Sequence, residues 1–239
     1  MTLYGTLLWL PQLKASLPRS IQAVKGWHKR CPGRTYPPLT WELTAAIAVQ
    51  MARAHHFALG VGTLLAFDCL LRVGELCAVT FDDIADDGDA RLGSEHKGMV
   101  IRLPSTKTGK NQFVTILEPA VQQLVRQLLM TSAKGAKLFK VTTGRYRTLL
   151  KATCASLGLS SEYVPHSLRH GGATRYRHVL NWSVESVMER GRWVSTMSAR
   201  RYIQSGKALL MSMSAPPTIA RLGATFTKDL VSYFNIASQ

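Results

Sequence analysis

The sequence has few acidic residues for its size. Among its 239 residues there are 14 aspartates and glutamates against 30 lysines and arginines, which gives a formal net charge of +16 and a pI near 10.1. This imbalance argues against acidic partners and indicates a polyanion. Only 18% of the residues are charged and 46% are apolar, which excludes a disordered basic tail because enough apolar surface exists for a packed core. The length allows one large domain, or one domain and a fragment of another.

Long apolar runs and paired cysteines are also missing. The longest apolar stretch, residues 57–71, is interrupted by Asp68 and falls short of the roughly 18 to 20 residues that a membrane helix needs. The N-terminal residues carry no basic region and reach Pro11 early, which argues against a signal peptide. The four cysteines form no CxxC pair and lie among apolar neighbours. We therefore expect reduced thiols, a location in the cytoplasm or nucleus, and no membrane partner.

Charge is distributed unevenly along the chain. No acidic residue precedes Glu42, whereas six basic residues do, and between Lys97 and Lys207 nineteen basic residues stand against four acidic ones. Five aspartates gather instead in FDDIADDGD, residues 81–89. This split favours one face that meets phosphates and another, the aspartate-rich one, that is turned away from them. A basic surface that is merely solvated is the alternative.

Proline and glycine mark an expected domain boundary. The segment CPGRTYPPLT, residues 31–40, contains three prolines and one glycine, which is typical of a linker. We predict two parts, a basic leader over residues 1–37 and a main domain with a C-terminal tail over residues 38–239. The tail from Ser214 onward is expected to be a connection to a last helix near residues 227–234.

The main domain is predicted to be mainly α with a small antiparallel β-sheet (α+β). Residues 43–80 alternate apolar and small side chains at helical spacing, which predicts two or three buried helices. The β-branched runs GMVIRLP and NQFVTIL flank the turn-like STKTGK and predict an antiparallel hairpin. Helical patterns return at residue 119 and continue through STMSARRYIQSGKALLM.

Two clusters of polar residues are candidates for chemistry. Arg72 lies in LLAFDCLLRVGEL, a predicted helix so apolar that a cation in its middle is costly unless it opens onto a cleft or pairs with a carboxylate. Glu75 lies three residues later on the same helical face, so a pair that only neutralises itself is the alternative. In VPHSLRHGGATRY, the cationic or titratable residues 166, 169 and 170 precede two glycines that would let a ligand or another chain approach closely. A basic helix start on the surface is the alternative there.

These residues occur in an order that resembles the catalytic domain of tyrosine recombinases, the phage integrase family. The ordered set comprises Arg72 with Glu75, Lys107 in the hairpin turn, His166-x-x-Arg169, Trp193 in ERGRW and Tyr202 in SARRYIQ. The resemblance runs over residues 38–210 and implies a DNA breaking and rejoining catalytic domain. The GRW sequence is similar to that of Cre-like members, and HGGATRY is similar to recombinases of eukaryotic mobile elements of the DIRS and Crypton types.

The resemblance implies a role for each residue of this set. Tyr202 attacks phosphorus and leaves a 3′-phosphotyrosine link and a free 5′-hydroxyl. Because a phenol with a pKa of about 10 is only around one part in a thousand ionised at pH 7, His166 is expected to act as its base. Lys107 gives a proton to the leaving 5′-oxygen, with Lys110 of the same turn as the substitute.

Charge on the phosphate is expected to be met by arginines. Guanidinium groups match phosphate oxygens bidentately, so Arg72 and Arg169 are the expected clamp. Trp193 would donate its indole N–H, the alternative being a large core aromatic. Glu75 and His170 are expected to hold these groups in place. Further basic residues are expected to contact DNA: Lys110, Arg175, Arg192, Arg200 and Arg201.

The predicted activity is therefore site-specific recombination of double-stranded DNA without a metal or cofactor, since the basic half of the sequence has no HExxH, CxxC or dense Asp/Glu motif. A tetrameric synapse on two duplexes is the expected assembly. Residues 1–37 are expected to be a remnant of a preceding helical DNA-binding domain. A DNA-binding remnant without catalytic activity and a type IB topoisomerase-like enzyme are the alternatives.

Overall fold

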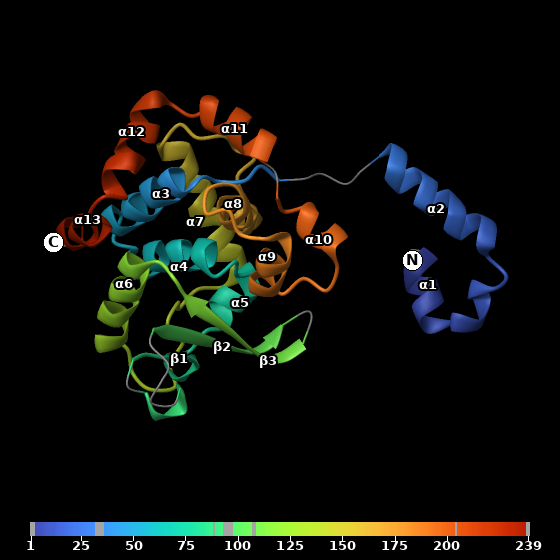
Figure 1. The fold of residues 1–239 in the computed structure, drawn as a ribbon, viewed down its shortest axis with the longest axis horizontal. Coiled ribbons are helices and arrows are strands. Elements are labelled where there is room, and N and C mark those ends of the chain that lie inside the picture. Colours follow the sequence, from blue (N-terminus) through green and yellow to red (C-terminus); the bar gives the residue numbers. More distant parts are fainter. Residues whose placement is uncertain are drawn as a thin grey trace. The chain divides into compact units, whose positions relative to one another are not determined.

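The computed structural model describes residues 3–31, 36–87, 89–92, 98–106, 109–203 and 205–237. The chain divides into two compact units, Met1–Thr35 and Tyr36–Gln239. In the first unit, α1 (Leu3–Trp9) and α2 (Pro18–Arg30) are joined by a 3-10 turn at Pro11–Lys14 (Figure 1). Proline begins both the turn and α2, where its missing N–H is tolerated because the first turn of a helix leaves that group unpaired in any case.

The second unit is mainly helical with a three-stranded antiparallel sheet in the order β1-β2-β3, as the sequence predicts. Its elements are α3 (Trp41–Arg53), α4 (Phe57–Asp68), α5 (Val73–Ala78), β1 (Ile84–Ala85), β2 (Met99–Thr106), β3 (Gly109–Ile116), α6 (Pro119–Met130), α7 (Thr143–Ser156), α8 (Pro165–His178), α9 (Val184–Gly191), α10 (Thr196–Arg200), α11 (Ser205–Met213), α12 (Pro217–Phe226) and α13 (Leu230–Ala237), with 3-10 turns at Phe81–Asp83 and Ala90–Leu92.

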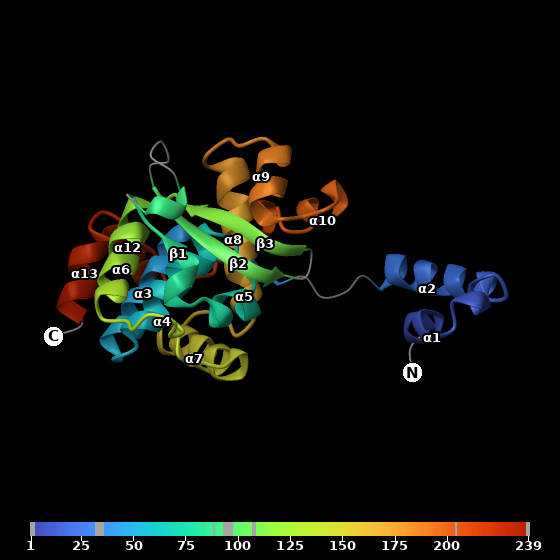
Figure 2. The ribbon, with the colours of Figure 1, turned by 90° about the horizontal axis from the view of Figure 1, so that it is seen from below.

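The predicted hairpin is present as β2 and β3, which Figure 2 shows side by side with β1 as one small layer. Ile101 lies opposite both Val114 and Ile84, so β-branched side chains stack across the sheet, which stabilises the pairing. The aspartates beside β1 are paired: Asp83 binds Arg102, and the carboxylate of residue 86 binds the guanidinium of residue 126 at 2.6 Å.

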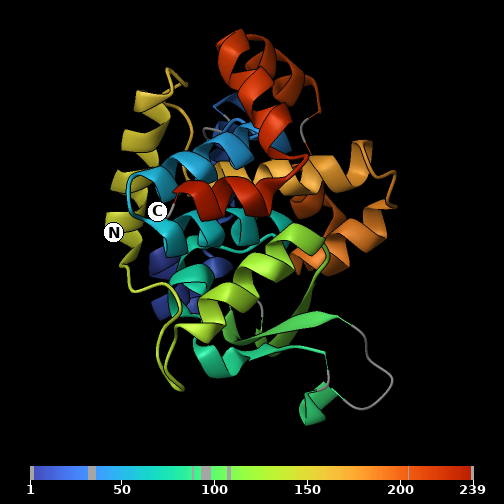
Figure 3. The same cartoon turned by 90° about the vertical axis from the view of Figure 1, so that its left-hand side faces the viewer.

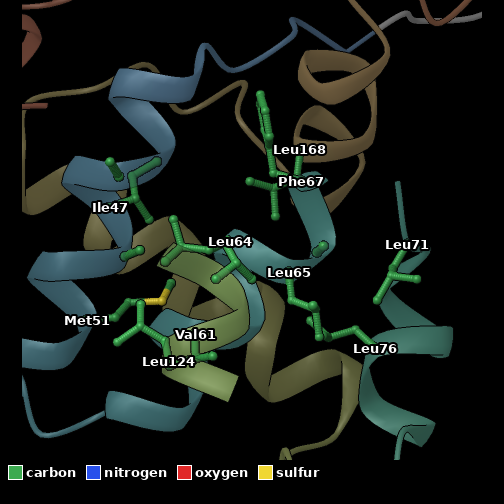
Figure 4. Packing of buried hydrophobic residues seen from close by; sticks show 14 of the residues in the cluster. Ile47, Met51, Val61, Leu64, Leu65, Phe67, Leu71, Leu76, Leu124 and Leu168 are labelled. Carbon is green, nitrogen blue, oxygen red and sulfur yellow. The ribbon is translucent and has the colours of Figure 1, made fainter. Parts of the chain in front are cut away.

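A large hydrophobic core lies between the helices, and a smaller cluster lies around Leu70, Tyr176 and Trp193. Figure 4 shows side chains of α3, α4, α6 and α8 in a single cluster, among them Ile47, Leu64, Leu124 and Leu168, which are all fully buried. The last helix, α13, runs alongside α3 and contacts it (Figure 3). In the part of the chain that the structure describes, no helix is long and apolar enough to cross a membrane.

The C-terminal tail differs from the prediction. The stretch expected to be an irregular connection forms α12, because Pro217 stands at the first helical position and pre-organises the helix instead of interrupting it. Gly223 of α12 lies directly against the backbone of Glu42 in α3, and Phe226 is buried. The tail therefore packs on the helical core from Pro217 onward.

The two glycines of α8 allow other backbone segments of the same chain to pack closely against this helix. A side chain at Gly171 would collide with the carbonyl of Leu39, and one at Gly172 with the carbonyl of Phe67. The N–H of Leu39 also donates to the carbonyl of Ser167 at 3.1 Å. The predicted linker is consequently packed against α8 in its second half, and the close approach expected of these glycines is satisfied within the chain.

Candidate active site

Arg72 does not lie inside a helix, as the sequence predicted, but caps the start of α5. Leu70 has a positive φ of 50° and ends the helical run after α4. The carboxylate of Glu75 accepts from the backbone N–H of Arg72 at 2.8 Å and from its guanidinium at 2.6 Å. The break leaves backbone carbonyls without helical partners, and arginines from elsewhere in the chain donate to them.

Arg169 of α8 is one of those arginines. Its side chain is fully buried, and its two terminal nitrogens donate to the carbonyls of Leu70 and Gly191. Its guanidinium carbon lies 4.5 Å from the centre of the Trp193 ring and 5.4 Å from that of the Tyr202 ring. Arg169 therefore places a positive charge directly beneath the two aromatic side chains.

Tyr202 lies between α10 and α11 rather than on a continuous helix, which differs from the sequence prediction. Its ring stacks on His170 with centroids 4.5 Å apart and lies 4.7 Å from the Trp193 ring. Thr174 donates to its carbonyl at 3.3 Å. These contacts hold Tyr202 against α8.

The hydroxyl of Tyr202 lies 2.8 Å from Nε2 of His166. Burial, followed by the charges of Arg169 and Arg72, lowers the pKa of His166 from 6.5 to about 4. Burial, followed by the neighbouring His166, lowers the pKa of His170 to about 3. Both imidazoles are therefore neutral at pH 7, and the His166 nitrogen is able to accept a proton from the phenol.

Glu75 is shared between arginines of two elements. Its second oxygen accepts from Arg192 at 2.9 Å, and Arg192 also donates to the carbonyl of Leu70 at 3.0 Å. Burial by itself would raise the pKa of Glu75, but Arg192 and Arg72 together lower it. One carboxylate thus stands among three guanidinium groups, counting that of Arg169, and the cluster keeps an excess of positive charge.

The structure brings together most of the residues expected at the site. Arg72, Glu75, His166, Arg169, His170, Trp193 and Tyr202 form one connected group. Lys107 lies outside the described residues. Among the described residues, no group of three or more His, Cys, Asp or Glu side chains is arranged to hold a metal ion.

The residues expected to contact DNA fall into two sets. Lys110, Arg200 and Arg201 are exposed. Arg175 instead binds Glu118 at 3.3 Å and stacks over an aromatic ring of α3. Arg192 is buried against Glu75 and offers no exposed cation.

Sequence reasoning missed Arg147 and Lys151. Both are exposed on α7 and line a cavity of about 630 Å³ that opens beside His166. They lie four residues apart, hence on one helical face, and α7 contains no acidic residue. The run of cations without acids was a usable signal, but the cavity itself depends on α7 and α8 meeting in space.

The helical fold with its small sheet resembles the crystal structure of XerA recombinase, with a TM-score of 0.51 and 18% sequence identity over 94% of this chain and 80% of that chain. The profile of the phage integrase family matches residues 42–208. The chain therefore belongs to the phage integrase family, whose members are tyrosine-type DNA recombinases. None of the curated proteins with which the chain was compared matches it.

Proposed function

We propose that this protein is a site-specific DNA recombinase that cuts and rejoins strands through a covalent 3′-phosphotyrosine at Tyr202. The observation that carries the proposal is the 2.8 Å contact between the Tyr202 hydroxyl and Nε2 of His166. A neutral base in hydrogen-bond reach of a phenol is what this nucleophile requires. The neighbouring arginines supply the positive charge that a phosphodiester demands.

In the proposed step, His166 accepts the phenol proton at Nε2 while the phenolate oxygen forms a bond to phosphorus. The bond from phosphorus to the 5′-oxygen breaks, and its electron pair leaves with that oxygen. Lys107, by its resemblance to the lysine of this family, gives the proton that completes the 5′-hydroxyl. In the reverse step a 5′-hydroxyl attacks the phosphotyrosine and Tyr202 recovers its proton.

The residues proposed to stabilise the charge on the non-bridging oxygens differ in how far they are exposed to solvent. The Arg72 side chain is 21% exposed and reaches the surface, so it contacts the phosphate directly, whereas buried Arg169 acts through its field. The indole nitrogen of Trp193 is buried and has no hydrogen-bond partner among the described residues. An unpaired buried donor is costly, and a phosphate oxygen bound there would remove that cost.

The cation-lined cavity beside His166 extends this site along the DNA. Arg147 and Lys151 are placed to hold backbone phosphates next to the scissile one, and exposed Lys110, Arg200 and Arg201 are further proposed contacts. Such contacts position the duplex without choosing its sequence.

The assembly proposed is a tetramer on two duplexes. After Tyr202, the side chains of Leu209, Leu210 and Met213 are 63%, 68% and 74% exposed, and an apolar surface of this kind favours association. The helical segment within residues 1–37 is proposed to contact DNA as well. The HGGATRY segment supports an origin in a eukaryotic mobile element of the DIRS or Crypton type.

The test uses a pool of labelled, nicked duplexes of randomised sequence. Cleavage next to the nick releases a short 5′-hydroxyl fragment, so the covalent adduct accumulates and migrates slowly on a denaturing gel. We expect the adduct with the wild type and with Tyr233→Phe, which lies on α13, and none with Tyr202→Phe.

Other outcomes distinguish the alternatives. An adduct that persists in Tyr202→Phe contradicts the choice of nucleophile. Binding by the wild type without any adduct leaves the non-catalytic DNA-binding remnant. Relaxation of supercoiled plasmid without site preference indicates a type IB topoisomerase-like activity.

A further inference from the structure

Arg192 adopts a backbone conformation that suits glycine better than arginine. It follows α9 with φ 57° and ψ 43°, in the left-handed region. A residue with a side chain is strained there because its Cβ crowds the following carbonyl. Backbone bonds close the turn, from the N–H of Arg192 to the carbonyl of Glu189 at 2.9 Å and from that of Trp193 to Met188 at 3.0 Å, and the arginine side chain adds contacts that a glycine would lack.

Those contacts are buried and polar. The guanidinium of Arg192 donates to Glu75 at 2.9 Å, to the carbonyl of Leu70 at 3.0 Å and to that of Cys69 at 3.3 Å. Its side chain is 5% exposed, so it does not reach solvent as the predicted DNA contact would. The left-handed turn directs the side chain inward, onto the break between α4 and α5.

Three consecutive residues at this turn each contact a different part of the proposed site. The carbonyl of Gly191 accepts from Arg169, Arg192 binds Glu75, and the ring of Trp193 lies 4.7 Å from that of Tyr202. The conformation of Arg192 therefore sets where its two neighbours lie.

Arg192 also changes the charge balance at Glu75. With Arg72 alone, the carboxylate would form a neutral pair and cancel the cation that the phosphate needs. With Arg192 on its second oxygen, one negative charge is shared by two positive ones, and Arg169 of α8 adds a third. The surplus is available to an anion.

We propose that Arg192 is a positioning residue that holds Glu75 between two guanidinium groups, so that Arg72 keeps its place and its positive charge toward the phosphate. Its effect on DNA cleavage rests on the proposed function. Its effect on Glu75 does not, because that contact belongs to the free protein.

The experiment compares Arg192→Gly and Arg192→Lys with the wild type. Arg192→Gly removes the side chain but suits the left-handed backbone. We expect the single-turnover rate of adduct formation to fall about 10- to 100-fold, by analogy with residues that orient the ligands of a metal centre. The dissociation constant for DNA should change less than about threefold, because Arg192 is buried and makes no DNA contact. Arg192→Lys keeps one cation near Glu75 and should recover part of the rate.

A second readout does not depend on activity. A carbon-13 titration of the Glu75 carboxyl, assigned with Glu75→Gln, should show a higher pKa in Arg192→Gly than in the wild type. Arg190→Ala is the matched control, since it removes another buried arginine near the end of α9 that binds Asp68 instead, and it should leave the Glu75 pKa unchanged.

The proposal is overturned if the Glu75 pKa is the same in Arg192→Gly and the wild type. It is also overturned if rate and affinity fall by equal factors, since that pattern indicates a direct DNA contact. If the wild type forms no adduct, the proposed function fails, and the Glu75 titration alone decides the role of Arg192. If Arg192→Gly does not fold, the same titration is made on Arg192→Met, which also removes the charge beside Glu75, and the same rise in the Glu75 pKa is expected.

Discussion

Two buried carboxylates flank the break between α4 and α5, and their surroundings differ in charge. Asp68 accepts from the Tyr176 hydroxyl at 2.5 Å, from the N–H of Leu117 at 2.9 Å and from Arg190 at 3.3 Å. Around Asp68, one carboxylate pairs with one guanidinium, so the buried charges cancel. The cluster joins α4, α8 and α9 to the connection between β3 and α6.

Glu75 has the same kind of partner, an arginine at the end of α9, but not the same balance. It faces Arg72 and Arg192, with Arg169 sharing the carbonyl of Leu70. Beside them, the indole N–H of Trp193 has no hydrogen-bond partner in the part of the chain that the structure describes. A balanced buried pair holds elements together, whereas an unbalanced one is prepared for an anion. The comparison therefore distinguishes a carboxylate that stabilises the fold, Asp68, from one that belongs to the proposed site, Glu75, only seven residues away.

The largest expected effect comes from removing the balanced carboxylate. Asp68→Ala leaves Arg190 buried beside no carboxylate, and we expect the free energy of unfolding to fall by about 3–5 kcal/mol. Urea unfolding followed by circular dichroism measures it. Glu185→Gln, an exposed position on α9, should change stability by less than about 0.5 kcal/mol. A loss below about 1 kcal/mol for Asp68→Ala would show that the cluster contributes little.

A smaller effect is expected from acid, and it arises at His170, whose ring stacks on Tyr202. The pKa of His170 is lowered in the folded state from 6.5 to about 3, so the unfolded chain binds a proton first as pH falls. Stability therefore declines below about pH 6.5, by up to about 2 kcal/mol at pH 5 from this residue. In His170→Asn the decline between pH 7 and pH 5 should be smaller by that amount.

Unfolding in urea at pH 7, 6 and 5 tests this. His178→Asn, an exposed histidine at the end of the same helix, is the control and should follow the wild type. Equal acid losses in the wild type and His170→Asn contradict a neutral buried imidazole at this position.

The smallest expected effect concerns the two cations of α7 that line the cavity beside His166. Arg147→Ala and Lys151→Ala should each reduce the slope of log affinity against log salt by about 0.9, the amount expected for one phosphate contact. Arg145→Ala, an exposed position of α7 outside the cavity lining, should not. Fluorescence anisotropy with one duplex over a range of salt concentrations measures the slopes. If the slopes of all three variants equal one another, the DNA does not contact the cavity lined by Arg147 and Lys151.

Local pattern predicted much of this molecule because the relevant contacts are local. The β-branched runs around residues 99–116 form the predicted hairpin, and Glu75 lies within reach of Arg72 because three residues separate them. The order of Arg72, His166, Arg169 and Tyr202 was enough to predict which residues gather, because their resemblance to one family carries information that spacing alone lacks.

What escaped prediction depends on contacts far apart in the sequence. Arg192 meets Glu75 across 117 positions, so its basic character alone made it look like a DNA contact. The helix expected through Arg72 breaks because distant arginines satisfy the carbonyls that the break exposes. The prediction for the C-terminal tail was wrong for a local reason, because a proline begins a helix as readily as it ends one, and Pro217 begins α12.

The packing of Leu39 on α8 also has a mechanical meaning. Its N–H is fastened to the carbonyl of Ser167, the residue after His166, and its carbonyl lies against Gly171. Leu39 is thus a point at which the start of the second unit is fixed to α8. A shift of Leu39 would act within one residue of the proposed base, so the packing of this segment bears on proton transfer at Tyr202.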